Sequence, residues 1–120
     1  MKMTNFMKEK THHDDYKDIR KDVQRITDMV ETAQNLDIDL DPQVIDDVNA
    51  FTHRLISERN LRKQRDLYLE SIQSCDHQKV EKLQSLINQA NETKVEGEYI
   101  QHAEKLTAQM SGNIKARETL

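Results

Sequence analysis

Three aspartates at alternate positions, Asp37, Asp39 and Asp41, form the spacing in this chain that is closest to a metal-binding loop. A calcium loop of the helix–loop–helix type also needs glycine at its sixth position and glutamate at its twelfth. Counted from Asp37, those positions hold Pro42 and Val48. We therefore interpret the three carboxylates as capping and solvated turn residues.

The histidines and the single cysteine offer no stronger site. No histidine stands at a zinc-type spacing from Cys75 or from another histidine. Cys75 and His77 share one connection, but closeness in sequence does not make a nucleophile and a base. The chain also lacks a glycine-rich phosphate loop and a nucleophile elbow. We expect a protein that is not an enzyme, with no catalytic residue, metal ligand or cofactor.

The composition indicates long helices with few connections. The chain has 120 residues, of which 35% are hydrophobic and 33% charged, and it contains only two glycines and one proline. Sheets and multi-loop enzymes need many turns, and turns use Gly and Pro to reach their backbone angles. The composition therefore predicts an all-α protein with a modest aliphatic core.

Charge, cysteine content and hydropathy restrict the expected partners and the expected cellular location. The net charge of −4 gives no general reason to bind nucleic acid. The single cysteine excludes an intramolecular disulfide and suits a reduced cytosolic thiol. No apolar run approaches the roughly 20 residues that span a bilayer, and the first residues lack the apolar region of a signal peptide. We expect a soluble cytoplasmic protein that binds neither nucleic acid nor membrane.

One helical hairpin pattern occurs twice in the chain. Apolar residues of segment 23–33 recur in segment 80–90 at a constant offset of 57 residues. Each copy is followed by a short turn with an aliphatic residue, Ile38 in the first and Val95 in the second, and then by another amphipathic stretch. A repeated helical pair is a packing unit whose apolar face needs a neighbour. The repeat therefore indicates structure and docking rather than catalysis.

The first expected helix, about residues 15–36, carries a heptad seam. Its residues are spaced by 3, 4, 3, 4 and 3 positions: Tyr16, Ile19, Val23, Ile26, Val30 and Ala33. Such spacing is typical of coiled coils, so a homodimeric coiled-coil scaffold is one interpretation. Met29 and Leu36 widen the apolar stripe, and the connection 37–42 is short. These features favour packing within one chain as a hairpin.

The second helix is expected to be long. Asp41 followed by Pro42 is a strong helix start, because the carboxylate caps backbone N–H groups and proline has no N–H to satisfy. No helix breaker follows before Ser74, which allows one helix of roughly 30 residues, or about 45 Å. A kink near residues 57–60 is the alternative that the sequence leaves open. At the hairpin end, Ile38 and Leu40 are expected to close the core.

These elements predict two antiparallel helical hairpins that share the long second helix, either as an elongated bundle or as a short solenoid-like stack. The expected organisation has three parts. Residues 1–13 form a flexible N-terminal arm, residues 14–73 the first hairpin with its extended second helix, and residues 74–120 the second hairpin.

Charge is distributed unevenly along the first hairpin. Between Arg25 and Arg54 there is no lysine or arginine, while seven acidic residues crowd the connection and its flanks. The exit of the second helix is basic. We interpret as partner-binding residues the basic stretch Arg54, Arg59, Arg62, Lys63 and Arg65. Opposite charges steer association, so the expected partner is an acidic protein surface such as that of tubulin, or another helical protein.

The same stretch has a second interpretation as a regulatory, calmodulin-type target. Its apolar anchors would be Leu55, Leu61 and Tyr68. The chain lacks the Ile-Gln-x-x-x-Arg pattern, because neither Ile72-Gln73 nor Ile100-Gln101 is followed by an arginine at that spacing. This interpretation stays open beside the docking one.

The apolar pattern of the second hairpin also carries a resemblance. Its residues are Val80, Leu83, Leu86, Ile87 and Ala90 and, after a short turn, Tyr99, Ile100, Ala103 and Leu106. Over residues 80–110, and more loosely over residues 23–55, the pattern resembles helical-hairpin segments of large ciliary and axonemal proteins, which act as structural spacers and docking modules. The resemblance implies a structural or adaptor role in a microtubule-based assembly, with a cytoskeletal or ciliary location.

Overall fold

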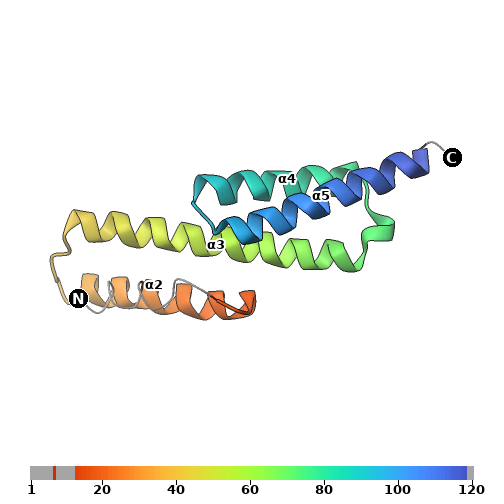
Figure 1. Cartoon of the computed structure of the whole chain (residues 1–120). Coiled ribbons are helices and arrows are strands. Elements are labelled where there is room, and N and C mark those ends of the chain that lie inside the picture. The colour runs from red at the N-terminus through yellow and green to blue at the C-terminus, as the bar shows by residue number, and fades with distance from the viewer. Residues whose placement is uncertain (1–6, 8–12, 119–120) are drawn as a thin grey trace. The chain divides into compact units, whose positions relative to one another are not determined.

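Long helices account for most of the chain. The computed structural model describes Met7 and residues 13–118, so the predicted arm, residues 1–13, lies outside the described residues apart from Met7 and His13 (Figure 1). The described residues form four α-helices, which are α2 (Ile19–Asn35), α3 (Pro42–Glu70), α4 (His77–Glu92) and α5 (Gly97–Glu118). Two short 3₁₀ helices, η1 (Tyr16–Asp18) and η2 (Ile72–Ser74), precede α2 and α4. No strand occurs among these residues, and the predicted all-α class is confirmed.

Aspartate side chains cap three of the helical segments. Asp15 Oδ1 accepts a hydrogen bond from the Lys17 N–H at 2.9 Å. Asp76 Oδ1 accepts from the Lys79 N–H at 2.9 Å, at the start of α4. At the start of α3, Asp41 Oδ1 accepts from the Gln43 N–H at 2.9 Å. These carboxylates satisfy backbone donors that have no partner within the helix and suit its positive end.

Helix α3 is one element of 29 residues, an outcome that the lack of breakers allows. The chain divides into two units inside this helix, unit 1 (Met1–Arg59) and unit 2 (Asn60–Leu120). The sequence placed the division between residues 73 and 74, at the connection. The division falls earlier because Leu61 and Tyr68 of α3 belong to the core of unit 2. An unbroken helix thus supplies both units.

In unit 1, α2 packs against the first half of α3. The cluster at their contact is built on two buried residues, Ile26 and Val48. Partly buried side chains packed against it are Met7, Met29, Val30, Leu40, Val44 and Phe51. Of the predicted seam, Ile19, Ile26 and Ala33 are buried within the single chain. The other seam residues, Tyr16, Val23 and Val30, are partly buried. The heptad spacing therefore serves packing within this chain.

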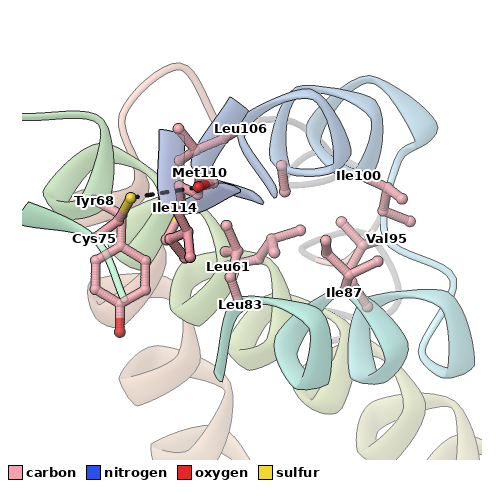
Figure 2. Packing of buried hydrophobic residues seen from close by; sticks show 12 residues of the cluster. Leu61, Tyr68, Cys75, Leu83, Ile87, Val95, Ile100, Leu106, Met110 and Ile114 are labelled. Carbon is pink, nitrogen blue, oxygen red and sulfur yellow. Dashed lines mark hydrogen bonds between the residues drawn. The ribbon is translucent and has the colours of Figure 1, made fainter. Parts of the chain in front are cut away.

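In unit 2, three helical segments share one core (Figure 2). The end of α3 contributes Leu61 and Tyr68. The residues from α4 and α5 include Leu83, Ile87, Ile100, Leu106, Met110 and Ile114. Ala90 and Ala103 are completely buried. Such small side chains allow the backbones of α4 and α5 to approach closely, and the remaining space is filled by aliphatic groups.

The repeat in the sequence produces the same turn geometry twice. After α2, the Ile38 N–H donates to the Ala33 carbonyl at 2.9 Å, and after α4 the Val95 N–H donates to the Ala90 carbonyl at 2.9 Å. The residue before each donor has a positive φ, 53° at Asp37 and 62° at Lys94. This is the Schellman arrangement, in which a left-handed residue ends the helix and an aliphatic residue follows it.

The two turns differ in how well that aliphatic residue is covered. Val95 is 5% exposed and belongs to the core of unit 2, whereas Ile38 is 52% exposed. Leu40 packs against the cluster of unit 1 as expected. The expectation that Ile38 also closes the core is wrong, because unit 1 leaves half of this side chain open to solvent.

The positive φ angles give a test of local strain. We expect Lys94→Gly to raise the free energy of unfolding by about 0.5–1 kcal/mol, because glycine adopts the left-handed region without the Cβ penalty. Asp37→Gly should gain less, since aspartate tolerates that region better than lysine. Urea unfolding followed by circular dichroism measures both. The control Lys82→Gly, at an exposed site inside α4, should lose about 1 kcal/mol.

The assignment of the end of α3 to unit 2 gives a second test. Leu61 is fully buried and Leu67, on the same helix, is 47% exposed. We expect Leu61→Ala to lower the free energy of unfolding by about 2–5 kcal/mol, and Leu67→Ala to change it by less than about 0.5 kcal/mol. Equal effects of the two substitutions in urea unfolding would contradict the shared core.

Candidate docking surfaces

Two of the three aspartates of the first turn have roles in the ends of helices. Asp41 caps α3, and Asp37 occupies the left-handed position that ends α2. Within Met7 and residues 13–118, no three His, Cys, Asp or Glu side chains lie together in a way that could hold a metal ion. None of the helices in this part of the chain has the length and apolarity of a membrane span.

Arg54, the first residue of the predicted basic stretch, contacts other residues of α3. Its guanidinium carbon lies 5.5 Å from the centroid of the Phe51 ring. Its Nη1 atom is 3.8 Å from Glu58 Oε1, and the Glu58 side chain is fully buried. A buried carboxylate is costly without a compensating charge, and Arg54 supplies such a charge beside Glu58. Arg59 is partly exposed.

Three residues of the predicted basic stretch lie in unit 2, and some of them make contacts within the chain while others are exposed. The Arg62 guanidinium lies 4.2 Å from the centroid of the Tyr99 ring, a cation–π contact with the first turn of α5. Arg65 Nη1 lies 3.2 Å from Asp66 Oδ1. Lys63 is exposed. Of the predicted basic stretch, Lys63 and the partly exposed Arg59 are thus the residues best placed to meet a partner.

The end of unit 2 around Cys75 is held by polar contacts. The Cys75 thiol is buried and donates to the Met110 carbonyl at 3.5 Å (Figure 2). Arg117 Nη2 donates to the Cys75 carbonyl, which links the end of α5 to the connection before α4. His77 Nε2 lies 2.8 Å from Glu118 Oε1. A shallow hollow of about 320 Å³ is lined by Asp76, His77, Ile114, Arg117 and Glu118. Its charges of both signs favour no single class of ligand.

The surroundings of Tyr68 at this end of unit 2 change the pKa of its hydroxyl group. Burial raises the pKa of the Tyr68 hydroxyl above its ordinary value of 10.0, and the nearby Asp76 carboxylate raises that pKa further. Both effects disfavour the phenolate, burial by removing water and Asp76 by repulsion. The Lys79 ammonium lies 5.8 Å from the centroid of the Tyr68 ring and also donates to the Ser74 carbonyl at 3.2 Å. The neutral phenol is therefore the form that suits the fold.

A buried polar pair in unit 1 escaped the sequence reasoning. His13 Nε2 lies 2.5 Å from Asp22 Oδ2, and both residues are 6% exposed. The pair joins the segment before η1 to the first turns of α2. Its residues are nine positions apart and belong to no motif, so only the folded chain brings them together.

A second feature missed from the sequence is an apolar surface at the first turn. Three aliphatic side chains there are exposed: Leu36 by 66%, Ile38 by 52% and Ile45 by 42%. We call these three residues the turn surface. The acidic residues in and beside the same segment are Asp37, Asp39, Asp41, Asp46 and Asp47, all exposed. The sequence contains one indication that Ile38 is exposed, because this residue has an aspartate on each side.

The comparisons with known proteins add no relationship. No protein-family model, curated protein or solved structure matches the chain.

The raised pKa of Tyr68 predicts a dependence of stability on pH. Above pH 10 the unfolded chain releases the Tyr68 proton while the folded chain retains it, so this contribution to stability is complete below pH 10 and is lost as pH rises through the folded pKa. In urea unfolding, Tyr68→Phe should lose less stability than the native chain between about pH 8 and pH 11. Absorbance at about 295 nm should show the same tyrosine ionising above its ordinary pKa. An equal loss of stability in both proteins would contradict the burial effect.

Proposed function

We propose that this protein is a non-enzymatic structural or adaptor protein that docks on other proteins through the exposed parts of its helices. The observation that carries the proposal is the exposed side of α3 in unit 2. Lys63 and Leu67 lie four residues apart, one helical turn, and both are exposed. A cation beside an aliphatic side chain suits a partner surface that combines acidic and apolar groups.

The partner proposed for this side is an acidic protein surface of the tubulin type, in a microtubule-based assembly. The charge of the basic stretch and the resemblance of the hairpins to ciliary and axonemal segments support this choice. Arg59 and Lys63 provide the attraction, and electrostatic steering would make binding sensitive to salt. Arg62 contacts Tyr99 of α5, whereas Arg54 and Arg65 contact residues of α3 itself, so these three arginines are assigned to contacts within the chain.

The burial of the apolar anchors favours this proposal over a calmodulin-type target. Leu55 and Leu61 are fully buried and Tyr68 is 9% exposed, so a calmodulin-like partner would have to draw them out of the cores. A homodimeric coiled coil through the α2 seam meets the same obstacle, because Ile19 and Ile26 are fully buried within one chain. Docking through exposed residues needs no such rearrangement.

Co-sedimentation with microtubules tests the proposed partner. The native protein is expected to pellet with microtubules, and Arg59→Glu/Lys63→Glu should bind at least about tenfold more weakly, because two attractive charges become repulsive. The control Lys21→Glu/Lys82→Glu makes the same change in net charge at exposed sites of α2 and α4 and should bind like the native protein.

Two results would count against the proposal. Failure of the native protein to pellet removes tubulin as the partner. Equal weakening by the test and control variants means that net charge alone, and not the basic stretch, determines binding. Circular dichroism of all three proteins should show equal helicity, which ensures that any difference lies in the surface.

A further inference from the structure

The two hairpin turns bury equivalent aliphatic residues to very different extents. Ile38 and Val95 both follow a left-handed residue and make the same backbone hydrogen bond, but they are 52% and 5% exposed. Ile45 and Ile100 are each the fourth residue of the helix that follows, and they are 42% and 8% exposed. The same positions are covered in unit 2 and open in unit 1.

Helix α3 contributes apolar side chains to the core of unit 2. Leu61 and Tyr68 lie in the cluster that contains Val95 and Ile100. The same segment places the Arg62 guanidinium 4.2 Å from the ring centroid of Tyr99, in the first turn of α5. The second hairpin thus packs with a helix that presents apolar side chains and a cation near its turn.

In unit 1, the residues that correspond to Val95 and Ile100 are Ile38 and Ile45, and both are exposed. Its cluster is formed by α2, the first half of α3 and Met7, and the turn surface of Leu36, Ile38 and Ile45 remains in contact with solvent. Exposed aliphatic side chains at one turn are costly in water, and where they gather they mark a binding surface. The internal comparison indicates that a helix is the element that fits this surface.

The charge around the turn surface determines which kind of helix. Asp37, Asp39 and Asp46 are exposed beside it. The last turn of α2 contains no basic residue, so the negative end of the helix dipole adds to these charges. No lysine or arginine occurs between Arg25 and Arg54 to offset them. A positively charged helix is therefore favoured and an acidic one is repelled.

We propose that the turn surface of unit 1 binds a basic amphipathic helix of another protein. The aliphatic side of that helix covers Leu36, Ile38 and Ile45, and its lysines or arginines meet the surrounding aspartates. This surface is distinct from the basic stretch on α3 and takes a partner of the opposite charge. A second copy of the chain is a poor occupant, because each copy carries a net charge of −4 and copies repel one another.

A designed peptide serves as the probe. We would titrate the isotope-labelled protein with an 18-residue helical peptide of leucine and lysine, and follow backbone amide shifts by NMR. The largest shifts are expected in residues 36–46. Leu36→Gln/Ile38→Gln should weaken binding at least about tenfold, because two apolar contacts are lost. The matched control Ile56→Gln/Leu69→Gln changes two exposed aliphatic residues of α3 outside residues 36–46 and should leave the affinity unchanged.

The charge requirement is tested separately. An 18-residue peptide of leucine and glutamate should not bind, and Asp39→Asn/Asp46→Asn should weaken binding of the lysine peptide by about threefold to tenfold. Shifts spread over the whole chain, or equal weakening by the turn and control variants, would overturn the proposal. Binding of the acidic peptide with equal affinity would also overturn it.

Light scattering at about 0.1 mM distinguishes the second-copy alternative. A monomer supports the proposal. A dimer that Leu36→Gln/Ile38→Gln converts to a monomer would show that a second copy covers the turn surface, and would overturn the choice of a partner helix. Circular dichroism should show unchanged helicity for both variants, since the replaced residues are exposed.

Discussion

Helix α3 has to supply apolar residues to two cores, and the rest of the structure depends on it. Val48 is part of the cluster of unit 1, and Leu61 and Tyr68 are part of the cluster of unit 2. Helix formation is cooperative, and helical spacing directs the apolar side chains within each half of α3 to the core of that unit. After Pro42, α3 contains no further proline and no glycine. The composition of α3 therefore suits a long helix that contributes side chains to both cores.

The turns show how a chain with few glycines ends its helices. Both hairpins use the left-handed conformation at residues other than glycine, Asp37 and Lys94. The hydrogen bonds of Ile38 and Val95 satisfy carbonyl groups that the helix ends leave open. The backbone solution is the same in both cases, and the difference in burial of the two aliphatic side chains arises from the surroundings. The same turn geometry thus occurs twice with different exposure of its aliphatic residue.

Charge is divided between the interior and the surface in a way that residue type alone does not reveal. Arg54 approaches a buried glutamate, and Arg62 lies over an aromatic ring, so both contribute to packing. Lys63 lies in the same run of basic residues and is exposed. The proposed docking functions follow from this division, since exposed charges select a partner, whereas Arg54 and Arg62 are engaged in contacts within the chain.

By itself, the sequence determined the features that depend on local interactions. Capping aspartates, helical periodicity, the lack of breakers and the repeated turn act over a few residues, and they predicted the all-α class, the start of α3 at Pro42 and its length. The tertiary structure decided what depends on distant neighbours. It assigned the end of α3 to unit 2, paired His13 with Asp22, and buried Val95 while leaving Ile38 exposed. Burial depends on which helices meet, and a local pattern of apolar residues is the same whether or not a neighbour covers it.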